Sequence, residues 1–114
     1  MNASSATVAA DVDEFVLAGL EKSPSKIVSP PRVAASPVQF ECRVTQIIQL
    51  KDQAEEVLEQ WLVLGEAVGI HIERSLIEDG IYRTASARPI TRGGGPADYF
   101  EITESQLFHM FRPA

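Results

Sequence analysis

The stretch 61–73 limits the possible folds more than any other, because it is apolar on both faces of the strand that it predicts. One parity carries Leu62, Leu64, Val68, Ile70 and Ile72, and the other carries Trp61, Val63, Ala67 and His71. Successive side chains of a strand point to opposite faces, so both faces of this strand need cover. Gly65 and Gly69 indicate a bulge, a bend or the close approach of another backbone.

A second long strand is predicted over 38–50, with one buried face. Val38, Phe40, Cys42 and Val44 alternate there with Gln39, Glu41, Arg43 and Thr45. The polar stretch 51–60 predicts a solvated connection, so the two strands should run antiparallel. Two long strands and a few short ones cannot close a barrel. We expect the missing cover to come from a partner subunit or from chain outside this sequence.

The segments before these strands are less regular. Residues 1–10 show no periodic pattern. A short helix is predicted next, with Asp11 as its N-cap, Glu14 three residues on, and Gly19 as its stop. The stretch 21–37 holds four of the seven prolines, which predicts an extended, irregular segment.

The last forty residues predict only short elements. The stretch 75–80 looks like a helical turn that ends at Gly80, and 81–83 and the region of Pro89 look extended. A glycine-rich loop over 91–99 leads to a short strand, YFEI. The stretch 107–111 is an apolar cluster that we expect to be buried.

Composition excludes several classes of function. The chain of 114 residues is enough for one domain, and its 45% hydrophobic content is that of a folded protein. The net charge of −6 speaks against nonspecific binding to nucleic acid or to anionic membranes. No apolar run approaches the roughly 20 residues of a membrane span, and no signal peptide is recognisable. The only cysteine, Cys42, cannot form an internal disulfide, and we expect it to be buried in a protein of the reducing cytoplasm.

Motifs for metal binding or hydrolysis are absent from the sequence. His71 and His109 are the only histidines, and no HExxH or CxxC accompanies them, so we expect no metal site. Serine-hydrolase, Walker A and Rossmann patterns do not occur. Arg92 beside Gly93–Gly95 could hold a phosphate or a carboxylate, although a turn with a solvated arginine is the simpler interpretation. Glu66 shares the parity of Leu62, so it meets a partner, is turned out by a bulge, or faces a ligand.

Five stretches, taken in order, resemble one known family. They are MNASSA, DEFVLAGL, SPPRVAASPVQFECRV, LVLGEAVGIHI and RPITRGGGPADYFEI. The chain resembles the flavin reductase-like proteins, FMN-binding split barrels that include flavoredoxins and the reductase components of two-component monooxygenases. The resemblance implies a mainly β fold, a partial FMN-binding split β-barrel with one or two short helices. It implies that residues 1–114 correspond to the C-terminal part of such a domain, without its N-terminal strands.

The resemblance also implies a set of cofactor-binding residues. Asn2, Ser4 and Ser5 match a segment near the FMN ribityl chain and phosphate. His71 matches a histidine that points toward the flavin and the nicotinamide, and Arg92 and Tyr99 match an element at the mouth of the site. Glu66 matches a glutamate with a structural role, while Ala67 and the third glycine of Gly93–Gly95 depart mildly from the family pattern. The flavin performs the hydride chemistry, so the chain needs no catalytic acid or base.

Three hypotheses about function stay open from the sequence. The first is an FMN-binding flavin reductase that takes hydride from NAD(P)H, works as a homodimer and serves a monooxygenase component. The second is a non-catalytic fragment that binds FMN or pairs with another subunit. The third is a remnant that folds poorly and aggregates through its strand edges.

Overall fold

The computed structural model describes residues 3–114 and divides the chain into two compact units. The first unit spans Met1–His71 and the second spans Ile72–Ala114. Four separate two-stranded sheets are present in the described residues, together with a few short helices. The expectation of a mainly β chain is therefore confirmed.

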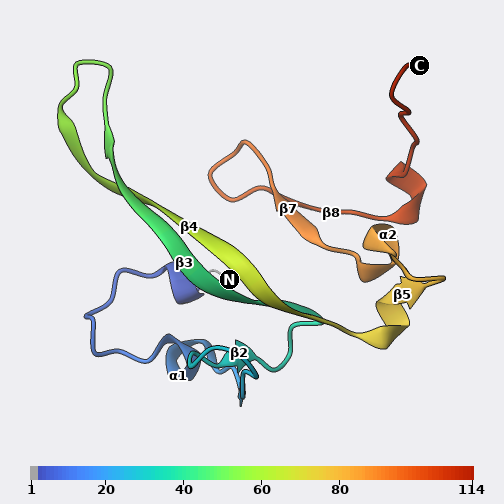
Figure 1. Ribbon diagram of the computed structural model, residues 1–114, viewed down its shortest axis with the longest axis horizontal. Coiled ribbons are helices and arrows are strands. Elements are labelled where there is room, and N and C mark those ends of the chain that lie inside the picture. Colours follow the sequence, from blue (N-terminus) through green and yellow to red (C-terminus); the bar gives the residue numbers. More distant parts are fainter. Residues whose placement is uncertain (1–2) are drawn as a thin grey trace. The chain divides into compact units, whose positions relative to one another are not determined.

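The first unit is dominated by one long hairpin of strands β3 (Val38–Lys51) and β4 (Val57–Ile72), drawn from green to yellow in Figure 1. The turn between them needs only residues 52–56, because the Asp52 carboxylate accepts hydrogen bonds from the backbone N–H groups of Ala54 and Glu56 at 2.8 and 3.0 Å. Strand β4 consequently begins four residues earlier than the sequence predicted. The two antiparallel strands were predicted correctly, and the solvated connection is shorter than expected.

The N-terminal part of this unit contains a 3₁₀ turn, η1 (Ala3–Ser5), and a short helix, α1 (Glu14–Ala18). The helix cap is Asp13, not Asp11, because Asp13 Oδ1 accepts the backbone N–H of Phe15 at 3.0 Å. Gly19 ends the helix with a positive φ of 63°, as predicted. The longest helix among residues 3–114 is thus far too short to cross a lipid bilayer.

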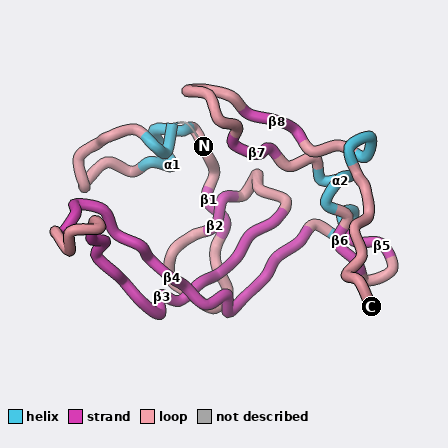
Figure 2. Tube along the Cα trace, turned by 90° about the horizontal axis from the view of Figure 1, so that it is seen from above, coloured by secondary structure: helices cyan, strands magenta, loops and turns pink. Residues whose placement is uncertain are grey.

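The proline-rich segment is extended, and a small ladder folds it back on itself. Strands β1 (Lys22–Ser23) and β2 (Arg32–Val33) pair antiparallel, with Lys22 opposite Val33. Figure 2 shows these two short strands in magenta beside the loop that joins them. The ladder turns residues 24–31 into a closed loop within the first unit.

The second unit consists of two small hairpins and short helical turns. Its elements are η2 (Arg74–Leu76), β5 (Ile77–Glu78), β6 (Ile81–Tyr82), α2 (Thr84–Ala87), β7 (Ile90–Arg92), β8 (Tyr99–Glu101) and η3 (Glu104–Gln106). Asp79 and Gly80 both have positive φ, 50° and 77°, and form the turn between β5 and β6. The predicted helical turn therefore ends at Leu76, and Gly80 belongs to a hairpin instead. Helix α2 was not predicted.

Burial in β3 differs from what the sequence predicted for its two faces. Phe40 and Val44 are 60% and 61% exposed and Cys42 is exposed, whereas Glu41 on the opposite parity is 1% exposed. Among residues 3–114, Glu41 is the sole buried residue and no hydrophobic side chain is buried. The reason is that the first unit supplies cover, the loop after β1, only on the Glu41 side of the hairpin.

Apolar side chains elsewhere also remain exposed. The apolar stretch 107–111, expected to be buried, has Leu107, Phe108, Met110 and Phe111 largely in solvent. On β4, Trp61, Leu62, Val63 and Leu64 are exposed on both parities. The need for cover that the sequence indicated is thus not met by the described residues themselves.

Candidate functional site

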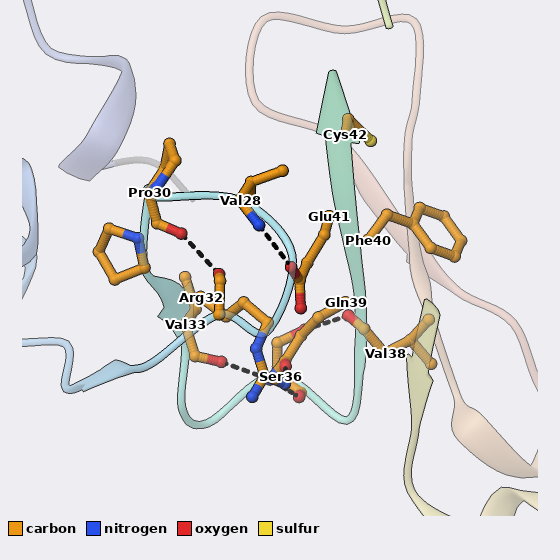
Figure 3. A pocket seen from close by; sticks show the side chains of 12 residues that line it. Val28, Pro30, Arg32, Val33, Ser36, Val38, Gln39, Phe40, Glu41 and Cys42 are labelled. Carbon is orange, nitrogen blue, oxygen red and sulfur yellow. Dashed lines mark hydrogen bonds between the residues drawn. The ribbon is translucent and has the colours of Figure 1, made fainter. Parts of the chain in front are cut away.

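The Glu41 side chain is the centre of the most highly organised polar cluster in the first unit. Three successive backbone N–H groups donate to its carboxylate: Lys26 to Oε1 at 2.9 Å, and Ile27 and Val28 to Oε2 at 2.6 and 3.0 Å. Figure 3 shows Glu41 pointing from β3 toward the loop that carries Val28, while Phe40 points to the other side of the strand. The arrangement is an anion-binding nest of backbone amides filled by a side chain of the same unit.

These donors lower the pKa of the Glu41 carboxyl from its ordinary 4.5 to about 2. The backbone N–H of Lys26 is the largest cause, and the hydrogen bonds from His71, Ile27 and Val28 add to it, while burial opposes them. Glu41 is therefore a carboxylate over the whole physiological pH range.

His71 supplies the fourth donor to this carboxylate. Its Nε2 lies 2.6 Å from Glu41 Oε1, and its side chain is 22% exposed against 0% for Glu41. Residues two apart on a strand share a face, so Gly69 and His71 of β4 both face this cluster. A Cβ at position 69 would lie 3.3 Å from the Cβ of Glu41, so the glycine makes room for the carboxylate.

A hollow of about 340 Å³ lies between the proline-rich loop and the start of β3 (Figure 3). Its polar walls are already engaged with one another. Arg32 bonds the Gln39 side chain and the carbonyl of Pro24, and Ser25 donates to the carbonyl of Pro30 at 2.6 Å. These bonds hold the loop at 24–31 in place, and Glu41 forms part of the wall of the hollow.

A second hollow of about 470 Å³ contains one of the residues expected to bind the cofactor. Ser4 lines it together with Glu14, Phe15, Leu20, Val33, Ala35 and Ser36. Val33 and Ser36 line the first hollow as well, so the segment around β2 separates the two. Ser5 lies in the same 3₁₀ turn as Ser4 and is exposed, and Asn2 lies outside the described residues.

Arg92 and Tyr99 meet each other in the second unit. They are direct partners across β7 and β8, and the Arg92 guanidinium lies 5.1 Å from the centre of the Tyr99 ring. Arg92 Nη2 also donates to the carbonyls of Gly95 and Pro96 at 2.9 and 3.0 Å. The expected solvated arginine is therefore a side chain that closes its own loop, although it remains exposed.

The expected site residues are thus distributed over both units. Ser4, Ser5 and His71 belong to the first, and Arg92 and Tyr99 belong together in the second. Glu66 is exposed, as are Leu62 and Leu64 of the same parity, so its exposure does not distinguish among the three interpretations. Residues 3–114 contain no cluster of three or more His, Cys, Asp or Glu side chains that could hold a metal ion.

Glu41 is the residue that sequence reasoning missed. The alternation in β3 assigned it to the solvent face, because its neighbours of the same parity are also polar. The available signal was on the other strand, where Gly69 and His71 leave space and a donor on one face. Together these two positions indicate that an acceptor packs against β4 there.

This chain is similar to curated proteins and to solved structures. No family model matches it. Two curated relatives are uncharacterized proteins: one from Halalkalibacterium halodurans, 32% identical over 95 residues, and one from Aquifex aeolicus, 31% identical over 86 residues. The matches cover 83% and 75% of this chain but 45% and 40% of those proteins. The chain therefore spans less than half the length of these relatives.

Solved structures give a closer indication of the fold. Nitrilotriacetate monooxygenase component B from Bacillus cereus matches 98% of this chain with a TM-score of 0.78 and 25% identity. The 2-nitrobenzoate 2-nitroreductase of Pseudomonas fluorescens matches 92% with a TM-score of 0.69 and 25% identity. A flavin reductase with a split-barrel domain from Shewanella frigidimarina matches 96% with a TM-score of 0.73 and, at 18% identity, shows the fold alone.

These matches cover 52%, 50% and 52% of the three solved chains, so this chain corresponds to about half of each. The fold class expected from the sequence is confirmed, because the chain is mainly β and its structural neighbours are split-barrel proteins of the flavin reductase type.

Proposed function

We propose that this chain is part of an FMN-binding flavin reductase, an oxidoreductase that takes hydride from NAD(P)H and passes it through FMN to a free flavin or another acceptor. The observation that carries the proposal is the match to a monooxygenase component B over 98% of the chain at a TM-score of 0.78. Hydride transfer by this route requires a flavin, a nicotinamide and a protein that orients them.

The hollow lined by Ser4 suits the ribityl chain and the ring of FMN better than its phosphate. The Ser4 and Ser36 hydroxyls suit the ribityl hydroxyls, and Phe15 and Leu20 offer apolar walls to a flat ring. Glu14 on the same hollow repels a phosphate, so the phosphate would need donors outside this hollow. Ser4 would thus bind the ribityl chain, a role that the family resemblance also assigns to Asn2 and Ser5, and the proposal assigns no phosphate site within the hollow.

The residues of this chain would bind and orient, while FMN when bound supplies the hydride chemistry. His71 would present its ring to the flavin and nicotinamide, and Glu41 would hold that ring in place. The family resemblance assigns Arg92 and Tyr99 to the mouth of the site, and within the second unit the Arg92 guanidinium lies over the Tyr99 ring. The proposed reaction needs no side chain of this chain to take up a proton. Replacing His71 should therefore weaken the binding of FMN or nicotinamide, while the bound cofactors still react.

We further propose a homodimer in the cytoplasm that serves a monooxygenase component. Strand β4 needs cover on both of its faces. It exposes Leu62 and Leu64 on one face and Trp61 and Val63 on the other. A second subunit would provide that cover. The match to a monooxygenase component B supports the proposed monooxygenase partner.

A titration of the purified chain with FMN, followed by quenching of flavin fluorescence, tests the cofactor proposal. We expect saturable binding, and then oxidation of NADH or NADPH when free flavin is supplied. The variant His71→Ala should weaken FMN or nicotinamide binding about tenfold, which corresponds to the loss of one or two good hydrogen bonds. The matched control is His109→Ala, because His109 is the only other histidine and should leave binding unchanged.

Absence of FMN binding by a chain that circular dichroism shows to be folded would contradict the proposal. It would favour the second candidate function, a subunit-pairing module without a cofactor. The specific observation behind that candidate is the exposure of apolar side chains on both faces of β4. Self-association without flavin binding is its signature.

A further inference from the structure

Each group within hydrogen-bond distance of the Glu41 carboxylate is a donor. The backbone N–H groups of Lys26, Ile27 and Val28 can only donate, and an ionised carboxylate can only accept. The remaining contact, 2.6 Å from Glu41 Oε1 to His71 Nε2, must therefore be a hydrogen bond in which Nε2 carries the proton. The environment of Glu41 thus requires a proton on Nε2 of the histidine.

We propose that Glu41 is a positioning residue for His71: it holds the imidazole in one orientation with the proton on Nε2, so that Nδ1 is the ring nitrogen that meets a ligand. Within residues 3–114, the only hydrogen bond of the His71 ring is the one through Nε2. Carboxylates commonly fix the tautomer and direction of a functional histidine in this way.

The packing around the pair limits how far the ring can turn. Glu41 is fully buried, so its carboxylate cannot follow a moving ring into solvent. Gly69, two residues before His71 on β4, leaves just enough space for Ile27 and Glu41 beside the strand. The three amides hold the carboxylate from the loop side. The histidine is thus connected to the loop at 26–28 through the Glu41 carboxylate.

The fixed tautomer predicts the chemistry of the ligand group at this point. In the neutral ring Nδ1 carries a lone pair and accepts a hydrogen bond, so its partner is an N–H donor and not a phosphate oxygen. A planar amide or imide N–H has this character. Both ligands of the proposed function carry one: the carboxamide of the nicotinamide and the imide of the isoalloxazine ring. This part of the inference rests on the proposed function, whereas the tautomer does not.

The tautomer can be measured on the full chain without any ligand. Long-range ¹H–¹⁵N correlation spectra of ¹⁵N-labelled protein distinguish the two ring nitrogens, and the variant His109→Gln assigns the signals, since the chain has two histidines. At a pH at which the His71 ring is neutral, we expect the proton on Nε2 and a directly observed Hε2 signal that exchanges slowly with water. A neutral ring with its proton on Nδ1, a mixture of tautomers, or an Hε2 lost to exchange would overturn the proposal.

The variant Glu41→Gln tests the role of the carboxylate, with Glu59→Gln as the matched control. Glu59 is exposed on β4, so its substitution removes the same charge without touching the cluster. We expect loss of the slowly exchanging Hε2 signal in Glu41→Gln and no change in Glu59→Gln. An unchanged signal in Glu41→Gln would refute the positioning role. The wild-type spectrum decides the question even if this variant fails to fold.

Separate additions of FMN and of reduced nicotinamide mononucleotide distinguish the two possible donors. A shift of the His71 Nδ1 resonance with FMN alone assigns the imide, and a shift only with the nicotinamide assigns the carboxamide. If flavin fluorescence shows FMN binding and neither ligand moves Nδ1, the ligand-facing role is wrong. If FMN does not bind at all, the proposed function fails while the tautomer result stands by itself.

Discussion

Gly69 of β4 lies directly against Ile27 of the proline-rich loop, so closely that a Cβ at position 69 would be 3.0 Å from the Ile27 Cδ1 atom. The same Cβ would lie 3.3 Å from the Cβ of Glu41. The contact joins the hairpin to the loop that surrounds the Glu41 carboxylate. A methyl group at this point of the strand would require the Ile27 and Glu41 side chains to shift by a few tenths of an ångström.

We expect Gly69→Ala to destabilise the first unit by about 1–3 kcal/mol, the usual cost of overpacking. The matched control is Gly65→Ala on the same strand, where the nearest atoms would be at 3.4 Å, an ordinary contact. Denaturant unfolding measures both. Hydrogen exchange of the Lys26, Ile27 and Val28 amides should also accelerate in Gly69→Ala alone. Equal stability of the two variants would show that the contact with Ile27 is not restrictive.

Acid should release the loop at 26–28 at an unusually low pH. The folded pKa of Glu41 is about 2 and its ordinary value is 4.5. Because the folded value is the lower one, the carboxylate contributes its full stabilisation above about pH 4.5, and this contribution is lost as the pH falls toward 2. The amide proton shifts of Ile27 and Val28 should titrate with a midpoint near 2.

The variant Glu41→Gln is the control for that titration, since it removes the ionisable group. Its Ile27 and Val28 amides should show no midpoint in this range. A wild-type midpoint near 4.5 would mean that the three backbone donors do not hold the carboxylate in solution. The pKa of Asp13 is also lowered, mainly by its hydrogen bond from Lys22, and the Phe15 amide reports on it separately.

The glycine run after β7 should tolerate an alanine at one position and not at another. A Cβ at Gly93 would lie 2.6 Å from the Phe100 ring and 3.2 Å from the carbonyl of Asp98, whereas at Gly94 nothing lies within 4 Å. We expect Gly93→Ala to cost about 1–3 kcal/mol in unfolding free energy. Gly94→Ala should remain within about 0.5 kcal/mol of the wild type. Thermal or denaturant unfolding compares them, and a reversed order would contradict the structure of this loop.

A charge on the uncovered face of β4 should weaken self-association. Leu62 is 46% exposed there, and Leu62→Glu would place a carboxylate in the surface that we propose to be covered by a second subunit. Sedimentation velocity should show at least a tenfold weaker dimer. Gln53→Glu, in the turn between β3 and β4, adds the same charge away from that face and serves as the control. A dimer equally stable in both variants would locate the interface elsewhere.

The long strands could be predicted from the periodicity of the sequence. The helix cap and the short hairpin depend on contacts that this periodicity does not reveal. The two long strands and the stop at Gly19 were predictable, because alternation and a left-handed glycine cap are local signals. The cap at Asp13 was missed, since two aspartates two residues apart can both begin a helix. The Asp79–Gly80 hairpin was missed because its strands have only two residues each and carry no pattern.

Burial was the property that the sequence predicted least well. Alternation assigned Phe40 to an interior that the described residues do not supply, and assigned Glu41 to solvent. A pattern reports which residues prefer to be covered, whereas actual burial depends on which segment reaches the strand. Here the segment is the loop at 26–28, and it reaches β3 through backbone donors that no side-chain pattern reveals. The pairing of Arg92 with Tyr99 depends likewise on the register of β7 and β8.

The short turn between β3 and β4 has a kinetic consequence. Only five residues separate the two strands, so their pairing requires little loop closure and should take place within about 1–10 μs, as in isolated hairpins. A lone two-stranded hairpin is at best marginally stable in water. The hairpin therefore forms early and repeatedly, but it persists only once something covers it. Where a second subunit supplies that cover, as we propose, folding and association are a single coupled event, whose rate should depend on protein concentration.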